Sequence, residues 1–279
     1  MIDLAYYNGV ITPYDSACIP LSDRAVFFGD AVYDVILGRA AVPYQAHLHI
    51  ERLIANAKAI GLSSTPSYEE ITDAIGMLLN ESHASDFVLY VQLSADSPRR
   101  THSRKGSGTN LLMTVTSANI PDKLEIINAV TLPDLRHGYC NIKTTDLLPA
   151  VLSVQDAEST GDEIAIFHKN GTVTEASYAN VSMIIANTLV THPLDSSILP
   201  GISQLNLIDA CKRLGIAHTE RCFTLKEIKE ADLLLITSTT KLVKVCARID
   251  GEPLECKRIR FAEQIFDLMH SDLVEKTSR

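Results

Sequence analysis

Hydrophobic and polar positions follow both a strand period and a helix period in the first part of the chain. Four apolar runs bounded by turn residues predict β-strands, at residues 6–11, 31–37, 87–94 and 110–116. Apolar residues repeat at helical spacing from about Ala46 and stop at Gly61, and glycine favours helix ends. Ser67 and Glu70 have capping-box spacing at the start of a second helical repeat. This part is therefore predicted to form a compact α+β unit.

Strand and helix patterns continue after residues 120–124, which we interpret as a linker because a proline interrupts a short polar stretch there. Strands are expected at 126–132, 181–186 and 233–237, and helices after Lys143, at 202–215, at 224–227 and at the carboxyl end. Asn170-Gly171 and Asp250-Gly251 are strong hairpin signals. We therefore expect an α/β (α+β) protein with two domains. These are a small amino-terminal α/β domain at 1–119 and a larger carboxyl-terminal mixed β domain with helices at 125–279.

Composition narrows the class of protein. The chain has 279 residues, 46% of them hydrophobic, which is enough to supply cores for two domains. A net charge of −9 argues against a nucleic-acid partner. No apolar stretch approaches the roughly 18 residues that span a bilayer, and the amino terminus lacks a signal pattern, so we expect a cytoplasmic protein without a membrane partner. The cysteines form no Cys-x-x-Cys pair, which favours reduced thiols and no metal site: Cys18, Cys140, Cys211, Cys222, Cys246 and Cys256.

Lys143 is informative because of what surrounds it in the sequence. It ends the tripeptide Asn-Ile-Lys at what we interpret as the end of a strand, and Glu175 follows in the second arm of the hairpin at Asn170-Gly171. Ser177 and Asn180 come just after it. An amine nucleophile and a rigidly held carboxylate suit an aldehyde cofactor whose ring nitrogen must stay protonated, and pyridoxal phosphate is such a cofactor. An ordinary exposed strand residue is the alternative interpretation of Glu175.

A cofactor phosphate requires amide donors, hydroxyls and a cation, and three segments of the sequence offer them. Residues 200–203 (Pro-Gly-Ile-Ser) open a predicted helix, whose free amides and positive dipole end attract anions. Residues 237–240 (Thr-Ser-Thr-Thr) place hydroxyls at the end of an apolar strand. Arg52 supplies a cation on the first predicted helix. Helix caps, strand ends and solvated helix faces use the same residue types, so each segment also has a purely structural interpretation.

The loop at residues 98–105 is basic and polar. Arginine binds a carboxylate through two parallel hydrogen bonds, and a nearby histidine adds a donor. Arg100 and His102 are therefore candidates to bind the α-carboxylate of an amino acid. A solvated positive loop is the alternative interpretation.

Taken together, six motifs in this order resemble the fold-type IV pyridoxal phosphate enzymes, which include D-amino acid aminotransferase, branched-chain aminotransferase and aminodeoxychorismate lyase. The motifs are Asp-Arg-Ala-Val-Phe-Phe-Gly-Asp-Ala-Val-Tyr-Asp at 23–34, His-x-x-Arg-Leu at 49–53, Asn-Ile-Lys at 141–143, Thr-Glu-Ala-Ser-x-x-Asn at 174–180, Pro-Gly-Ile-Ser at 200–203 and Thr-Ser-Thr-Thr at 237–240. The resemblance implies pyridoxal 5'-phosphate bound between a small and a large domain of a homodimer. It also implies a catalytic Lys143 that forms a Schiff base with the cofactor, and Glu175 beside the ring nitrogen. The implied cofactor-binding set is Lys143, Glu175, Arg52, Ser177, Ile202, Ser203, Ser238, Thr239 and Thr240.

Within this family the chain looks most similar to the D-amino acid aminotransferases. The resemblance implies that Tyr33, with Arg100 and His102 from a loop of the partner subunit, binds the substrate carboxylate. We therefore expect amino transfer from D-alanine or a similar D-amino acid to 2-oxoglutarate. An aminodeoxychorismate lyase, a branched-chain L-amino acid aminotransferase, and a cofactor-free protein with this fold are the alternatives. Three departures from the family pattern bear on the substrate range: Ala95-Asp96, Tyr178 and Lys241.

Overall fold

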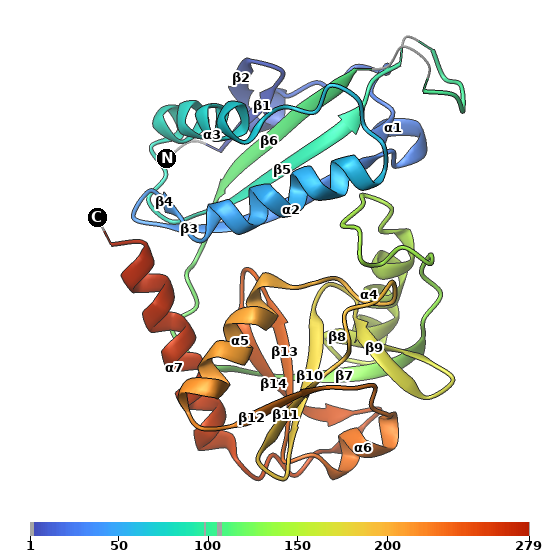
Figure 1. The fold of residues 1–279 in the computed structure, drawn as a ribbon, viewed down its shortest axis with the longest axis vertical. Coiled ribbons are helices and arrows are strands. Elements are labelled where there is room, and N and C mark those ends of the chain that lie inside the picture. Colours follow the sequence, from blue (N-terminus) through green and yellow to red (C-terminus); the bar gives the residue numbers. More distant parts are fainter. Residues whose placement is uncertain (1–2, 98, 105–107, 279) are drawn as a thin grey trace. The chain divides into compact units, whose positions relative to one another are not determined.

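The computed structural model describes residues 3–97, 99–104 and 108–278 (Figure 1). Its chain divides into two compact units. The first unit consists of Met1–Ile120, Ile142–Asp146 and Leu273–Arg279, and the second of Pro121–Asn141 and Leu147–Asp272. Neither unit is therefore formed by one continuous stretch of the chain.

The first unit contains a six-stranded antiparallel sheet in the order β2-β1-β6-β5-β3-β4. Its strands are β1 (Leu4–Tyr7), β2 (Val10–Pro13), β3 (Ala31–Arg39), β4 (Val42–Pro43), β5 (Phe87–Ala95) and β6 (Thr109–Ser117). Its helices are the 3₁₀ turn η1 (Tyr14–Ser16), α1 (Ala25–Phe28), α2 (Ala46–Ala59) and α3 (Tyr68–Ser82).

Two helices and the sheet share one core in this unit (Figure 1). Ile50 and Leu53 of α2 and Ile71 of α3 are buried with strand residues such as Leu89. The predicted capping box at the start of α3 is confirmed, because the Glu70 N–H donates to the Ser67 hydroxyl at 3.2 Å and the Ser67 N–H donates to Glu70 at 2.7 Å. The helical repeats therefore predicted both helices and the faces they bury.

The predicted strand at 6–11 is wrong, because the turn between β1 and β2, which form a hairpin, lies inside that range. The chain reverses at Asn8 and Gly9, which have φ values of 47° and 94°. Asparagine and glycine tolerate this left-handed backbone better than other residues, which is why Asn-Gly marks two-residue hairpin turns. Asn8-Gly9 is thus the same hairpin signal as Asn170-Gly171.

The second unit contains a nine-stranded mixed sheet in the order β12-β11-β10-β13-β14-β7-β8-β9, with β15 paired to β14. The pairs β7–β8, β7–β14 and β11–β12 are parallel, and the others are antiparallel. The strands are β7 (Glu125–Pro133), β8 (Ile164–Lys169), β9 (Thr172–Ala176), β10 (Asn180–Ile185), β11 (Thr188–Thr191), β12 (Ala217–Glu220), β13 (Leu233–Ser238), β14 (Leu242–Ile249) and β15 (Glu252–Pro253).

Four helices accompany this sheet among the described residues: α4 (Leu148–Ser159), α5 (Ile202–Arg213), α6 (Leu225–Glu230) and α7 (Ile259–Lys276), whose residues from Leu273 on belong to the first unit. Both predicted hairpins are confirmed, since β8 pairs with β9 and β14 pairs with β15. The capping box that begins α6 joins Thr224 and Glu227. The short strands β11 and β12 were not predicted.

Candidate active site

Lys143 is held beside β3 by backbone hydrogen bonds. The Tyr33 N–H donates to the Lys143 carbonyl at 2.9 Å, and the Thr145 N–H donates to the Ala31 carbonyl at 3.1 Å. Thr144 forms an isolated β-bridge with the same strand. The prediction that Lys143 ends a strand is wrong, because Lys143 follows a turn and lies in no strand, and only an isolated bridge joins its segment to β3.

The Lys143 amine lies against an aromatic pair. Its Nζ is 4.4 Å from the centre of the Tyr33 ring and donates to the Tyr33 hydroxyl at 3.4 Å. The Tyr33 ring stacks on Tyr90 with centroids 5.3 Å apart, and the Tyr90 hydroxyl donates to Gln92 at 2.6 Å. Burial, with a smaller effect of Tyr33, raises the pKa of Tyr90, so that side chain stays neutral. In the described part of the chain no carboxylate pairs with the Lys143 amine, so the amine is available to an incoming group.

Arg52 lies on α2 and binds the carboxylate of Asp34, which is only 1% exposed. Its Nε and Nη2 donate to Asp34 at 2.8 Å each, and His49 Nδ1 lies 2.7 Å from the same carboxylate. Burial opposes ionisation of Asp34, but the hydrogen bonds from His49 and Arg52 outweigh it and hold the pKa of Asp34 well below its usual range. The Arg52 side chain is 13% exposed, so the alternative interpretation of a solvated helix residue is wrong. Its contact with a cofactor phosphate stays a prediction.

Replacing Asp34 by asparagine is expected to lower the free energy of unfolding at pH 7 by about 3–5 kcal/mol, because it leaves buried charge without its partner. The folded-state pKa of Asp34 lies below the unfolded value of about 4, so the stabilisation is present above about pH 4. It is lost as the pH falls through the folded-state pKa. Urea unfolding at stepwise lower pH should therefore show the two proteins converging in stability below about pH 4.

Asp267→Asn is the matched control, since Asp267 is exposed on α7 and should show no such loss. A stability gap between wild type and Asp34→Asn that stayed constant down to pH 3 would contradict the proposed ion-pair contribution.

Glu175 lies near the end of β9 and is buried rather than exposed, so the alternative interpretation of an exposed strand residue is wrong. One carboxylate oxygen accepts a hydrogen bond from Arg136 and also forms an ion pair with it. The other oxygen accepts from Asn180 Nδ2 at 3.2 Å and from the Leu199 N–H at 3.0 Å. Donors on both oxygens fix the plane of the carboxylate and stabilise its negative charge.

Arg136 is a site residue that the sequence interpretation missed. It binds Asp134 through Nε and Nη2 at 2.9 and 2.8 Å, and Asp134 also accepts from the Thr174 hydroxyl at 2.8 Å. Burial disfavours the charge of Arg136, but Asp134 and then Glu175 raise its pKa, so it stays a cation. The Asp-x-Arg spacing just after β7 is the signal that could have found it, because an acid and a base two residues apart at a strand end can pair.

Asn180 brings three predicted segments together. Besides Glu175, its Nδ2 donates to the Leu199 carbonyl at 2.8 Å, just before α5. A Cβ on Gly201 would lie 1.9 Å from Asn180 Oδ1, so only glycine fits at that position. Asn180 also pairs in register with Thr237 at the end of β13. The carboxylate, the start of α5 and the hydroxyl-rich strand end therefore belong to one site in the second unit.

This site has the donors that a phosphate requires. No side chain caps the start of α5 among the described residues, so the amides of Ile202 and Ser203 are first-turn donors without an intrahelical acceptor. Thr237 Oγ1 is buried without a hydrogen-bond partner in the described part of the chain. A buried polar atom of this kind costs about 1–3 kcal/mol unless a ligand or water satisfies it. Ser238, Thr239 and Thr240 follow and are partly exposed.

The Ser177 hydroxyl is engaged within the fold. It lies 2.8 Å from the Ser153 hydroxyl of α4 and accepts from the Ala165 N–H at 3.2 Å. Both partners belong to the elements that flank the β9 end. Its predicted role in cofactor binding therefore depends on its position next to Glu175, and it stays a prediction.

Arg100 and His102 lie in the loop between β5 and β6, and both are exposed. The Arg100 guanidinium lies 5.1 Å from the centre of the Phe28 ring, and the His102 ring lies 5.4 Å from the same ring. Within residues 99–104 of this loop, neither side chain has a carboxylate partner. Pro98 and Lys105, which belong to the predicted basic loop, lie outside the described residues.

The departures from the family pattern have defined environments. Lys241 donates to Glu125 at 2.8 Å, so its charge is already balanced inside the second unit. Tyr178 is 54% exposed, and burial of the remainder, with nearby Glu163, raises its pKa. Asp96 forms an isolated bridge with Asp23 beside β5. Lys241 is therefore paired with a carboxylate of its own unit, whereas about half of the Tyr178 side chain is exposed to solvent.

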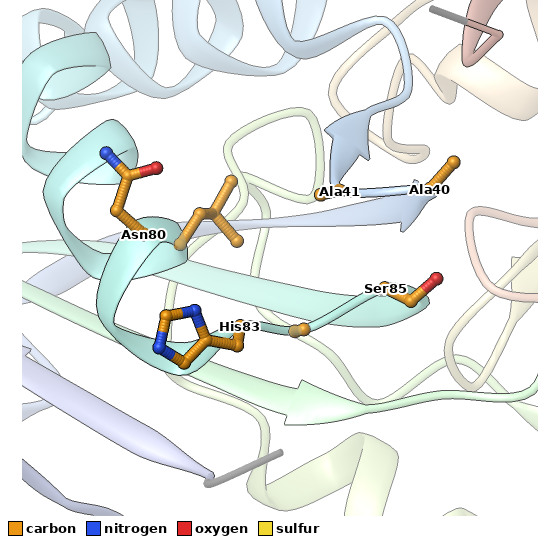
Figure 2. A pocket seen from close by; sticks show the side chains of 7 residues that line it. Ala40, Ala41, Asn80, His83 and Ser85 are labelled. Carbon is orange, nitrogen blue, oxygen red and sulfur yellow. The ribbon is translucent and has the colours of Figure 1, made fainter.

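A shallow pocket of the first unit lies away from these residues. Figure 2 shows Asn80 and His83 from the end of α3 beside Ala40 and Ala41 of the turn after β3, with Ser85 nearby. None of the predicted site residues lines it. We assign it no role in catalysis.

Comparison with known proteins gives a consistent result. A family model described as amino-transferase class IV matches residues 31–249. A D-alanine aminotransferase from Bacillus licheniformis is 30% identical over 89% of this chain and 89% of its own length, and one from Listeria monocytogenes is 31% identical over 98% and 95%. The solved structure of a branched-chain aminotransferase from Thermoproteus uzoniensis with norvaline has a TM-score of 0.86 at 22% identity, covering 98% of this chain and 95% of that one. Within the described residues, no helix is long and apolar enough to cross a membrane.

Proposed function

This chain belongs to the class IV aminotransferase family, and we propose that it transfers the amino group of D-alanine or a similar D-amino acid to 2-oxoglutarate. The main support for a D-amino acid substrate is that Arg100 and His102 are exposed and form no ion pair with a carboxylate within the described residues. The 30–31% identity to D-alanine aminotransferases supports the same assignment. The fold-type IV architecture expected from the motifs is confirmed by the structural neighbours.

The cofactor of this family is pyridoxal phosphate, which supplies an aldehyde and a ring that accepts electrons. The residues fit such a group, because Thr237 Oγ1 lacks a partner and the start of α5 has no side-chain cap among the described residues. Arg52, the amides of Ile202 and Ser203, and the hydroxyls of Ser238, Thr239 and Thr240 would hold its phosphate, and Ser177 would lie beside it.

Lys143 would carry the cofactor and then act as the acid and base. Its amine would act as a general base that takes the proton from the substrate Cα, and then as a general acid that returns it to the other reacting carbon. Its backbone pairing with β3 fixes the start of the side chain, and the Tyr33 hydroxyl 3.4 Å from Nζ restricts the end. Both restraints reduce the conformational entropy that the amine loses when it reaches a reactive geometry.

Glu175 would face the ring nitrogen and keep it protonated. A carboxylate near a ring nitrogen favours the protonated form. The donors around Glu175 keep it ionised and oriented, because Arg136, Asn180 and the Leu199 N–H contact it from two sides.

The substrate carboxylate would be held by Tyr33 together with Arg100 and His102 of a second copy of the chain. Guanidinium and carboxylate form two parallel hydrogen bonds, so an arginine fixes the orientation as well as the charge. The exposure of both loop residues suits a group that is lent to a neighbouring subunit. We therefore propose a homodimer in which this loop completes the partner's site.

A substrate panel tests the proposed reaction. With 2-oxoglutarate present, the kcat/KM for D-alanine is expected to exceed that for L-leucine by on the order of 100-fold, because only one hand of substrate places its carboxylate on Arg100. Pyruvate formed from D-alanine is followed with lactate dehydrogenase and NADH. Omitting 2-oxoglutarate should stop turnover after one half-reaction.

The same panel separates the two rival reactions. A faster reaction with L-leucine would favour a branched-chain aminotransferase. Continued pyruvate release from aminodeoxychorismate without any 2-oxo acid would favour the lyase, because elimination needs no amino acceptor. Either result would contradict the proposed D-amino acid transamination.

A further inference from the structure

We propose that Arg24, Asp30 and Arg104 form an ion-pair clamp that positions the loop carrying Arg100 and His102, and that Arg24 is thereby a positioning residue for substrate recognition. This inference rests on the proposed function, because it assumes that Arg100 and His102 bind the substrate carboxylate.

Asp30 is the centre of the clamp. Arg24 Nε lies 2.7 Å and Arg104 Nε 2.8 Å from the same Asp30 oxygen, and Arg104 Nη2 binds the other oxygen. The side chains of Arg24 and Asp30 are 6% and 7% exposed. Burial opposes ionisation of Asp30, but Arg104 and then Arg24 lower its pKa, so the carboxylate stays ionised between the two guanidinium groups. Arg104 also donates to the Ile60 carbonyl at the end of α2, which ties the segment just after His102 to that helix.

Arg24 connects this ion pair to the loop backbone. Its Nη1 donates to the Thr101 carbonyl and its Nη2 to the His102 carbonyl, the latter at 3.3 Å. One planar guanidinium thus fixes two consecutive peptide units next to Arg100. A lysine could keep the charge opposite Asp30 but has a single nitrogen, so it could not make the same set of bonds.

Phe28 completes the arrangement as a shared surface. Arg24 lies 4.5 Å and Arg100 5.1 Å from the centre of its ring, and the His102 ring lies 5.4 Å away. The buried arginine therefore binds the backbone, while the exposed Arg100 and His102 side chains rest on the ring and keep their polar groups for a ligand. A binding loop held in advance loses less entropy on binding, which raises affinity without any new ligand contact.

The test uses Arg24→Lys in the cofactor-loaded enzyme. The KM for D-alanine is expected to rise about 10-fold, since two hydrogen bonds from a charged group are lost, while kcat stays within about 2-fold. The visible spectrum of the bound cofactor should not change. Arg258→Lys is the matched control, because Arg258 contacts Phe261 and Asn187 in the second unit and has no place in the site.

A double-mutant cycle separates positioning from general damage. In an Arg100→Ala/His102→Ala background, Arg24→Lys should add less than about 2-fold to the KM, because no carboxylate ligand is left to position. An added 10-fold increase in that background, or an unchanged KM in the wild-type background, would overturn the clamp. If Arg24→Lys fails to fold, Arg104→Gln is used instead, since the Arg104 side chain is 32% exposed and its loss leaves Arg24 on Asp30.

The cycle also distinguishes failure of the clamp from failure of the proposed function. Arg100→Ala/His102→Ala alone should raise the KM for D-alanine by roughly 100-fold, and Arg99→Ala in the same loop should not. An unchanged KM in the double variant would overturn the carboxylate site and the clamp with it. If the double variant has a much higher KM and Arg24→Lys raises the KM by the same factor in both backgrounds, the clamp is overturned but the carboxylate site is not.

Discussion

Lys143→Ala is expected to abolish transamination, with turnover falling by roughly 10⁴-fold or more, because the amine that carries the cofactor and moves the proton is removed. The fold should change little. The Lys143 side chain has contacts with Tyr33 only among the described residues, and the backbone bonds that hold its segment to β3 do not involve the side chain. The variant should therefore remain folded and inactive.

Two measurements on the purified protein check this expectation. After borohydride reduction, mass spectrometry should find the cofactor covalently attached to the wild-type protein and absent from Lys143→Ala. Thermal unfolding should give similar midpoints for both. Lys169→Ala serves as the control, since Lys169 is exposed and its amine donates to the Ser197 hydroxyl at 3.4 Å. Covalent attachment and full turnover in Lys143→Ala would show that another lysine carries the cofactor.

The elements of the fold that could be predicted are those set by local chemistry. Capping boxes at Ser67 and Thr224 and the turn at Asn170-Gly171 each need only residues that are close in sequence, and each is present. Long apolar repeats predicted α2 and the strands β3, β5 and β6 for the same reason. Short strands such as β12 carry too few residues for a period to be recognised.

Features that depend on distant partners could not be predicted. The segment Ile142–Asp146 belongs to the first unit through its bonds with β3, although it lies far beyond that unit in sequence. Neither its composition nor its period shows which strand it pairs with. The motifs that resemble the family therefore located Lys143, whereas the strand assigned to it from local pattern was wrong.

The site residues also divide into those that sequence motifs identify and those whose partners only the fold shows. Lys143 and Glu175 stood out because the resemblance implies a role for each. Asp34 also ends a motif, but its pairing with Arg52, like that of Arg136 with Glu175, depends on contacts that only the fold makes. The helix spacing of His49 and Arg52, three residues apart on α2, is compatible with a shared acid, yet it does not identify which one. Polar partners of this kind follow from tertiary contacts, and sequence alone gives only the residue types.

Glu175→Gln is expected to lower kcat by roughly 10- to 100-fold. A hydrogen bond to a charged group contributes about 1.5–3 kcal/mol, and each 1.36 kcal/mol of barrier corresponds to a factor of ten in rate. Without the carboxylate charge, the ring nitrogen would no longer be held protonated during the reaction. The KM should change less than kcat, because Glu175 would contact the cofactor rather than the substrate. Steady-state kinetics with D-alanine and 2-oxoglutarate measure both.

The substitution should also destabilise the protein, because a glutamine amide cannot accept on both sides. Arg136 donates to one Glu175 oxygen and the Leu199 N–H donates to the other, so the amide nitrogen faces a donor in either orientation. A loss of about 1–3 kcal/mol in the free energy of unfolding is expected. Asp162→Asn is the matched control, because Asp162 is a buried carboxylate that binds Arg248 at 3.0 Å in the same unit. A loss of stability without loss of kcat in Glu175→Gln, as expected for the control, would assign Glu175 a structural role and leave the ring nitrogen without its proposed partner.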